Sequence, residues 1–396
     1  MNKLAIHGGK PVRSRRLNYG RQTIDEDDIA AVVATLRSDF LTTGPKVSEF
    51  EEAFANHTQS DHAVAVANGT AALHTAMNAL GIQEGDEVIV PTLTFAATAN
   101  CVLYQRGKPV LVDVSPETLT ICPQAVQNAI TPHTKAIIAM DYAGQPCDYD
   151  RLQQIANEHQ LALIADACHS LGATYKGRRV GNLADLTVFS FHPVKPMTTG
   201  EGGMITTHRP ELADRMRRFR NHGISVDHRE REENGSWLYE IADLGYNYRL
   251  TDIQCALGIS QLNKLPHWTQ KRQSIAQTYN SALSAIHEIT PLKLAPKRTH
   301  AYHLYVIRID FSALSASKPP FFQALQAEGI GANVHYIPVH LHPLYGENFN
   351  LGLGLCPHAE RAYEEMISLP IFPAMTSQDT QDTLDALEKV IKFYRH

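Results

Sequence analysis

Short runs of apolar residues alternate with helix-like segments along the first part of the chain. The apolar runs lie at 63–67, 87–90, 109–114, 136–140, 162–167, 186–191 and 204–207. Between several of them, stretches typical of helices lie at 70–80, 96–104, 123–129 and 149–159. Strands that alternate with helices predict an α/β fold, with a mostly parallel sheet covered by helices on both faces.

The two ends of the chain have a different pattern. An irregular arm reaches about residue 22, Thr23 and Glu26 fit a capping box for a helix that runs to Leu36, and a second helix is expected over 47–58. After a helix that starts near Asp252, the C-terminal part predicts these elements in order: helix 268–286, strand 303–310, helix 319–329, strand 333–336 and helices 359–366 and 377–393. We therefore expect a large domain, 1–266, and a smaller C-terminal α+β domain, 267–396.

Composition narrows the class of protein. The 396 residues are 43% hydrophobic and 19% charged, which is ordinary for a soluble globular protein. The formal charge of −5 is spread along the chain, which argues against nucleic-acid binding. The six cysteines have no metal-binding spacing, and no apolar stretch has the length of a signal peptide or a membrane span. We expect a cytoplasmic protein with reduced thiols and no membrane association.

Lys195 follows the apolar run 186–191 and is the first candidate for chemistry. Most single lysines are solvated surface residues, but Pro193 and Pro196 stiffen the surroundings of this one, and glycines follow it. A desolvated lysine can form a Schiff base with a carbonyl compound. If that compound is pyridoxal 5′-phosphate, the chain must also supply a carboxylate for the pyridine nitrogen and a cradle for the phosphate.

Asp166 meets the first of these requirements. It stands at the end of an apolar run, where a buried carboxylate is costly unless a cation or a strong donor pairs with it. A protonated pyridine nitrogen is such a partner. His169 can orient Asp166 or cover the face of the cofactor. The alternative is that Asp166 only caps the next helix.

Gly69 and Thr70 supply a candidate cradle, because they begin a helix directly after the first apolar run. The free N–H groups of a helix N-terminus bind phosphate readily, although most such turns are only caps. Ser190 is placed to add a hydroxyl to the same phosphate. Phe95 follows the second apolar run and can stack on a flat cofactor, or it can belong to the core.

Taken together, these motifs resemble the DegT/DnrJ/EryC1/StrS family of sugar-nucleotide aminotransferases. The resemblance is carried by Asn-Gly-Thr-Ala-Ala-Leu from Asn68, Asp-Ala-Cys-His-Ser-Leu-Gly-Ala from Asp166, and Ser-Phe-His-Pro-Val-Lys ending at Lys195. It implies the aspartate aminotransferase fold (fold type I), with pyridoxal phosphate on Lys195 and its ring nitrogen on Asp166. The phosphate would be held by the residues of the cradle: Gly69, Thr70 and Ser190.

The resemblance also implies a homodimer with shared active sites. In the family, the asparagine that matches Asn247 reaches the cofactor phosphate of the other subunit. The segment 245–250 by itself shows only a loop before a helix, so the dimer is an expectation from the resemblance alone.

Several stretches are most similar to the branch of the family that acts in pseudaminic acid biosynthesis. That branch aminates C4 of a UDP-linked 4-keto-6-deoxy-N-acetylhexosamine, and the family expectation for the amino donor is glutamate. The substrate positions that carry over are Tyr19, Asp39, Phe40, Leu41, Thr42, Asn247, His335, Tyr336, Ile337 and Pro338. Candidate cations for the diphosphate are Arg21, Lys46 and Arg249, each of which can also be an ordinary surface charge.

Other functions remain open at this point. The substrate can be another nucleotide-linked keto sugar, such as a UDP-4-keto-pentose or a dTDP-4-keto-hexose. A related sugar dehydratase is disfavoured, because relatives with that activity have histidine in place of Lys195. A non-catalytic regulator is disfavoured by the intact set of Lys195, Asp166 and Ser190. The histidines at 335, 340 and 342 lack further ligands at suitable spacing, so we expect no metal.

Overall fold

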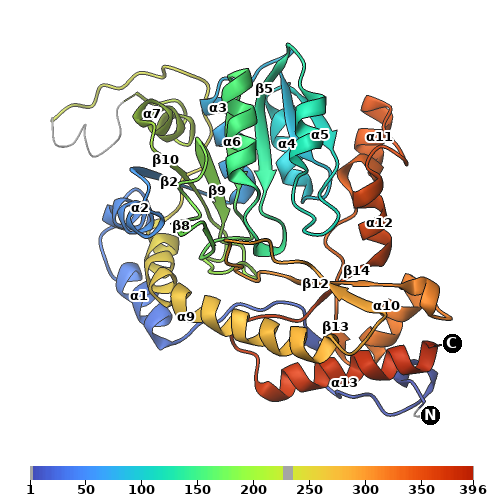
Figure 1. The fold of residues 1–396 in the computed structure, drawn as a ribbon. Helices are drawn as coiled ribbons and strands as arrows, with labels where there is room; N and C mark the ends of the chain where they lie inside the picture. Colours follow the sequence, from blue (N-terminus) through green and yellow to red (C-terminus); the bar gives the residue numbers. More distant parts are fainter. Residues whose placement is uncertain (1–2, 226–234, 396) are drawn as a thin grey trace.

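A seven-stranded sheet forms the centre of the computed structural model, which describes residues 3–225 and 235–395 (Figure 1). The strand order is β2-β10-β9-β6-β5-β3-β4, and all strands except β10 run parallel. The strands are β2 (His62–Val66), β3 (Glu87–Pro91), β4 (Lys108–Val112), β5 (Thr134–Met140), β6 (Ala162–Asp166), β9 (Leu186–Ser190) and β10 (Gly203–Thr207). They correspond to the seven predicted apolar runs, so the mostly parallel sheet is confirmed.

Helices cover both faces of this sheet, as predicted. One face packs against α2 (Pro45–Thr58), α5 (Pro123–Ala129), α6 (Tyr149–His159) and the first part of α9 (Asp252–Leu283). The other face packs against α3 (Gly69–Ala79), α4 (Ala96–Tyr104) and α7 (Pro210–Phe219). The sequence did not predict α7. Each central strand is buried from both sides, which explains why these strands are continuously apolar.

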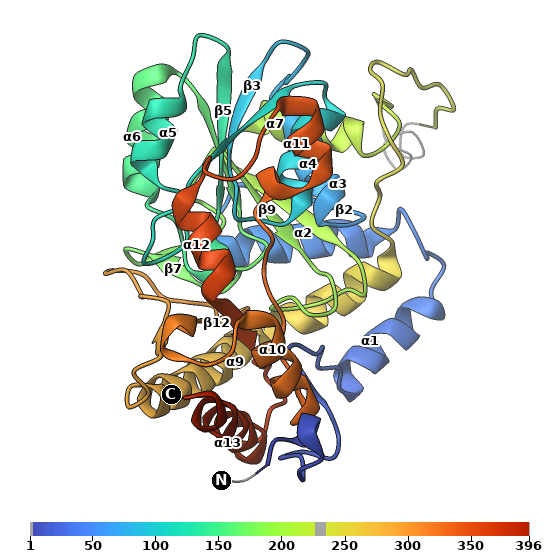
Figure 2. The same cartoon turned by 90° about the vertical axis from the view of Figure 1, so that its right-hand side faces the viewer.

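The C-terminal part is built on a three-stranded antiparallel sheet (Figure 2). Its strands are β11 (Ile289–Pro291), β12 (Tyr305–Ile309) and β14 (Met366–Leu369). The helices of this part are α10 (Lys318–Ala327), α11 (Pro343–Phe349), α12 (Pro357–Glu365) and α13 (Ser377–Tyr394). The N-terminal arm joins it, because β1 (Leu17–Asn18) pairs in parallel with β13 (Ile330–Gly331). A small hairpin, β7 (Thr174–Tyr175) and β8 (Arg178–Arg179), completes the fold.

The predicted start of the first helix is wrong. Helix α1 (Glu26–Leu36) is capped by Asp25, not by Thr23, and Asp28 completes the capping box. Asp28 is fully buried because it also accepts hydrogen bonds from Ser260 and Gln261 on α9, at 2.6 and 2.7 Å. The capping box of Asp25 and Asp28 is local, and the contacts of Asp28 with α9 anchor it to a helix distant in sequence.

Two further predictions differ from the structure. The strand expected over 333–336 is absent apart from a single bridge between Asn333 and Ser368, because the chain leaves the sheet there. The helix expected from Asp252 and the one expected over 268–286 form one helix, α9, which contains Pro266. The expected domain division at 266/267 therefore falls inside α9, and the division itself stays a prediction.

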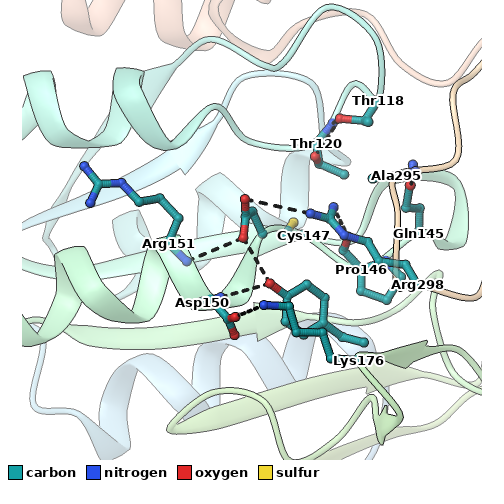
Figure 3. A network of polar contacts seen from close by, with 12 residues as sticks. Thr118, Thr120, Gln145, Pro146, Cys147, Asp150, Arg151, Lys176, Ala295 and Arg298 are labelled. Carbon is teal, nitrogen blue, oxygen red and sulfur yellow. Dashed lines mark hydrogen bonds and ion pairs between the residues drawn. The ribbon is translucent and has the colours of Figure 1, made fainter.

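Loop 145–148 holds the connection between β11 and β12 against the large sheet (Figure 3). Gln145 donates to the carbonyl of Lys293 at 3.1 Å and accepts from the N–H of Ala295 at 2.6 Å. Arg298 donates to the carbonyl of Pro146 at 2.8 Å. These contacts fix the segment that continues to residue 303, near the carboxyl ends of the central strands.

Asp141 is a fully buried carboxyl directly after β5. It accepts hydrogen bonds from the hydroxyls of Ser170 and Tyr149, at 2.6 and 2.8 Å, and from the N–H of Cys147 at 2.8 Å. Burial raises the pKa of Asp141 to about 6, although these hydrogen bonds act in the opposite direction. Asp141 therefore keeps its proton up to a higher pH in the folded protein than in the unfolded chain.

This difference predicts a pH dependence of stability. Between about pH 4 and 6 the unfolded chain ionises Asp141 while the folded protein does not, so the free energy of unfolding falls as the pH rises. A shift of two pKa units corresponds to roughly 3 kcal/mol. We measure the free energy of unfolding of Asp141→Asn and of wild type in urea. Between pH 4 and pH 7, we expect the difference between them to shift in favour of the variant by up to that amount. A difference that is independent of pH would contradict the raised pKa.

Candidate active site

The carboxyl ends of the central strands open onto a cavity of about 580 Å³. Met140, Asp166 and Ser190 end β5, β6 and β9, and all three line it. Ligands of parallel α/β sheets bind at this edge. The cavity brings together most of the residues that the sequence predicted for the cofactor: Gly69, Thr70, Phe95, Asp166, His169, Ser190 and Lys195.

The start of α3 forms a cradle just after the carboxyl end of β2. Asn68 caps the helix by accepting a hydrogen bond from the N–H of Ala71 at 2.8 Å. A Cβ on Gly69 would lie 2.7 Å from the Cβ of Ser190, so only glycine lets the helix start approach that hydroxyl. The first N–H groups of a helix have no acceptor within the helix and attract anions. This arrangement fits a phosphate group.

Asp166 is 3% exposed and receives two hydrogen bonds. The hydroxyl of Thr98 on α4 donates to Oδ2 at 2.8 Å, and the N–H of Cys168 donates to Oδ1 at 3.2 Å. The two oxygens of an ionised carboxylate have about four acceptor sites between them. Asp166 therefore keeps acceptor capacity for a cationic donor in the cavity, and the alternative of a helix cap does not account for its position in the cavity wall.

Lys195 lies half-buried in the wall of the cavity, in the turn after β9. Its own N–H donates to the carbonyl of His192 at 2.9 Å, which closes the turn. Burial lowers the pKa of the Lys195 amine, and the nearby Cys168 and Asp166 act in the opposite direction. A lowered pKa increases the fraction of free amine, the form that acts as a nucleophile or takes up a proton.

Two aromatic side chains form a wall of the cavity. Phe95 is 56% exposed and its ring centroid lies 5.9 Å from that of Tyr336. The core alternative for Phe95 is therefore wrong, because the ring faces open space beside the cavity. Tyr19, which reaches this region through the pairing of β1 with β13, packs 4.9 Å from His335.

His169 is held as a neutral ring at the side of the cavity. Its Nε2 lies 3.1 Å from the hydroxyl of Tyr336, and its ring centroid lies 4.3 Å from that of His303. Burial lowers the pKa of His169 well below its usual value, and the charge of Lys195 adds to the effect. A neutral imidazole can donate or accept a hydrogen bond in the cavity without adding a positive charge to that of Lys195.

The segment around His335 is fixed from two sides. Its Nδ1 lies 2.9 Å from the hydroxyl of Ser368 on β14, and its carbonyl accepts from the phenol of Tyr142 after β5. Burial lowers the pKa of His335 to about 4. His335 and Tyr336 line the cavity, whereas Ile337 and Pro338 are absent from its lining, and the substrate roles of all four stay predictions.

Other predicted residues lie outside the cavity of the single chain. Asp39, Phe40, Leu41 and Thr42 form an exposed loop before α2, and Asn247 is exposed and absent from the lining of the cavity. Of the candidate cations, Lys46 pairs with Glu49 at 2.5 Å and Arg249 donates to Asn221 at 2.7 Å. Arg21 is exposed. Their substrate roles stay predictions.

Sequence analysis missed several residues of the cavity. Thr98 and His303 contact the predicted residues Asp166 and His169 directly. The remaining additions to the wall are Asn68, Leu73, Ala97, Met140, Cys168, His192, Val194, Glu201, Asn333 and Val334. Nothing in the local sequence distinguishes Thr98 from an ordinary threonine near a helix start, because its contact with Asp166 forms only in the folded structure.

Two of the C-terminal histidines, His335 and His340, have side-chain partners within the protein. His340 is fully buried between Thr92, whose hydroxyl lies 2.6 Å from Nδ1, and Glu360, whose carboxylate lies 3.0 Å from Nε2. His335 contacts Ser368, as described above. Among residues 3–225 and 235–395, no group of three or more potential metal ligands comes together.

Two kinds of sequence comparison identify relatives of the chain. The model of the DegT/DnrJ/EryC1/StrS aminotransferase family matches residues 22–388. The chain is 44% identical to an uncharacterized protein of Methanocaldococcus jannaschii, over 96% of this chain and 99% of the relative. It is 39% identical to the spore coat polysaccharide biosynthesis protein SpsC of Bacillus subtilis, over 96% of this chain and 98% of the relative.

Solved structures of similar proteins have the same fold. PseC of Helicobacter pylori, an aminotransferase involved in the biosynthesis of pseudaminic acid, is 32% identical with a TM-score of 0.90, and the match covers 96% of this chain and all of that one. The putative sugar aminotransferase Spr1654 of Streptococcus pneumoniae, in its PLP form, is 32% identical with a TM-score of 0.89, over 96% and 99% of the two chains.

None of the described helices is long and apolar enough to cross a membrane.

Aminotransferases of this family depend on pyridoxal phosphate, and the residues present fit that cofactor. The glycine cradle at Gly69 and Ser190 suits its phosphate, and the buried carboxylate of Asp166 has acceptor capacity for its ring nitrogen. Lys195 supplies an amine in the same cavity.

The cradle predicts the effect of a single methyl group. In Gly69→Ala, the new Cβ would press on Ser190 at the phosphate position. We expect the affinity for pyridoxal phosphate, measured by quenching of protein fluorescence, to fall at least about tenfold while the circular dichroism spectrum is retained. Gly352→Ala is the matched control, because a Cβ there meets open space. Equal affinities of the two variants would contradict the cradle.

Proposed function

The chain belongs to the DegT/DnrJ/EryC1/StrS aminotransferase family, and we propose that it transfers an amino group from an amino acid, glutamate in the first instance, to C4 of a UDP-linked 4-keto-6-deoxy-N-acetylhexosamine. The observation that carries the reaction class is the convergence of Lys195, Asp166 and the Gly69 cradle in one cavity. Neither a dehydratase nor a regulator requires the lysine in that position.

Each residue has a defined task in this reaction. Pyridoxal phosphate, when bound, would supply a carbonyl carbon that carries the amino group and a ring that acts as the electron sink. Asp166 accepts a hydrogen bond from the protonated ring nitrogen, and the cradle holds the phosphate. Nζ of Lys195 would hold the cofactor at rest. Once freed, it would move a proton from Cα of the amino donor to the cofactor in the first half of the exchange, and from the cofactor to C4 of the sugar in the second half. Phe95 and Tyr336 limit the access of water to that amine.

The substrate proposal rests on the walls of the cavity and on similarity to PseC. Tyr19, His335 and Tyr336 form one wall with apolar faces and polar edges, which suits a deoxysugar with an N-acetyl group. PseC matches across 96% of this chain. A product of this kind would be the UDP-linked 4-amino altrosamine of pseudaminic acid biosynthesis, made in the cytoplasm.

A second candidate is another nucleotide-linked keto sugar. The spore coat polysaccharide protein SpsC is 39% identical to this chain, whereas PseC is 32% identical. Similarity to a protein of spore coat polysaccharide biosynthesis favours a second sugar as a candidate, with the same chemistry at the cofactor. The selection of hydroxyl groups separates the two candidates, and it depends on a few polar contacts.

We also infer that the active unit is a homodimer. Asn247 is exposed and lies outside the cavity of its own chain. The same segment exposes large apolar side chains, with Trp237 83% and Leu244 81% exposed. Surfaces of this kind are typical of protein interfaces. A second subunit would cover them and bring Asn247 to the neighbouring cradle.

The substrate proposal is tested by identifying the product. The protein is supplied with pyridoxal phosphate, glutamate and UDP-2-acetamido-2,6-dideoxy-β-L-arabino-hexos-4-ulose, and the product is assigned by NMR. We expect an amino group at C4, and no product from Lys195→Ala. Preference for the unepimerised D-xylo isomer, or amination at C3, would instead favour the second candidate. If no keto sugar in a panel of UDP and dTDP derivatives is aminated, the proposed function is wrong.

Hybrid dimers test the shared site. Lys195→Ala chains and Asn247→Ala chains are each expected to be almost inactive alone. If Asn247 acts across the interface, a hybrid contains one intact site, so an equal mixture should recover about a quarter of wild-type activity. If Asn247 acts within its own chain, each site of a hybrid lacks one residue and no activity returns. Native mass spectrometry confirms that hybrids have formed.

A further inference from the structure

We propose that Thr94 and Thr98 form a hydroxyl relay that holds the carboxylate of Asp166 ready for a cationic ring nitrogen. The inference rests on the proposed function, because it concerns the contact of Asp166 with pyridoxal phosphate. It concerns two residues that the family resemblance did not assign.

The relay is a continuous chain of three short contacts. The hydroxyl of Thr98 donates to Oδ2 of Asp166 at 2.8 Å, and the hydroxyls of Thr94 and Thr98 lie 2.7 Å apart. All three side chains are at most 3% exposed, so water does not compete for these hydrogen bonds.

The chemistry of the groups fixes the direction of each hydrogen bond. An ionised carboxylate only accepts, so Thr98 must give its single hydroxyl proton to Asp166. Thr98 then has no proton left for Thr94, and Thr94 must be the donor of the second bond. Each hydrogen bond in such a chain polarises the next, which strengthens the bond that reaches the charge.

The position of Thr98 in its helix supports a role beyond helix structure. A threonine inside a helix commonly bonds back to the carbonyl four residues earlier. Here the residue four positions earlier is Thr94, and the Thr98 side chain contacts the Thr94 hydroxyl and a carboxylate on β6. The contact therefore ties α4 to the end of a strand across the cavity wall.

The same turn of α4 carries Phe95, which is exposed beside the cavity. The N–H of Thr98 donates to the carbonyl of Phe95 at 3.1 Å. One helix start thus supplies a ring for the face of the cofactor and a hydroxyl for the residue at its nitrogen. Displacement of Thr98 would loosen the contact of Phe95 with the cofactor face and the contact of Asp166 with the ring nitrogen. Loss of the Thr98 hydroxyl alone would affect only the second contact, which depends on the positive charge of the nitrogen.

Two cofactors separate these effects. Apoprotein is titrated with pyridoxal phosphate and with its 1-deaza analogue, in which a carbon replaces the ring nitrogen. Thr98→Val keeps the shape of the side chain and removes the hydroxyl. We expect this variant to bind pyridoxal phosphate about tenfold more weakly than wild type does, and to bind the analogue as well as wild type does. Thr98→Ser should restore the affinity for pyridoxal phosphate.

Thr75→Val is the matched control. Thr75 is a fully buried helical threonine whose hydroxyl has no hydrogen-bond partner in the described chain, so its replacement should change neither affinity. Thr94→Val should weaken the binding of pyridoxal phosphate less than Thr98→Val does, about threefold, because it acts through Thr98.

The outcomes distinguish the two proposals. If Thr98→Val loses affinity equally for both cofactors, or for neither, the relay is overturned. The proposed function still stands in that case, provided that the wild-type apoprotein binds pyridoxal phosphate. Failure of the wild-type apoprotein to bind pyridoxal phosphate would overturn the proposed function, and the relay with it.

Discussion

Asp166 keeps a carboxylate almost completely buried at the end of β6, and much of the active site is arranged around that charge. A buried charge is costly unless donors or cations surround it. Thr98 and the N–H of Cys168 satisfy part of the demand, and Lys195 contributes a nearby positive charge. The remaining acceptor capacity faces the cavity, where a protonated pyridine nitrogen would complete the set.

The cavity is assembled from segments that are distant in sequence. The large sheet supplies the strand ends, α3 supplies the phosphate cradle, and the C-terminal part supplies His303, His335 and Tyr336. Two residues of the loop after β5 hold these C-terminal residues against the sheet. Tyr142 bonds to the segment of His335, and Gln145 bonds to the segment that leads to His303. The cofactor chemistry and the substrate wall are thus positioned by different parts of the chain, which allows relatives to change their sugar while keeping their reaction.

Much of this arrangement follows from the sequence. The seven central strands are buried on both faces, so they appear as continuous apolar runs that local pattern identifies without tertiary information. In a parallel sheet the residues after such runs meet at one edge. For this reason Asp166, Ser190 and Lys195 could be expected in one site from their order alone, and the family motifs assigned them a cofactor.

Tertiary contacts decided what local pattern could not show. Asp28 is buried against α9, where Ser260 and Gln261 donate to it, and no local pattern shows these contacts. Residues 334–338 form no strand, and His335 is held instead by the side chain of Ser368 on β14 and by Tyr142 after β5. Thr98 is an ordinary helical threonine until α4 packs beside β6. The sequence by itself thus determined the sheet and the charged residues at its edge, because both depend on burial along single strands. Only the folded structure decided their partners, because hydrogen bonds between distant segments leave no periodic signal.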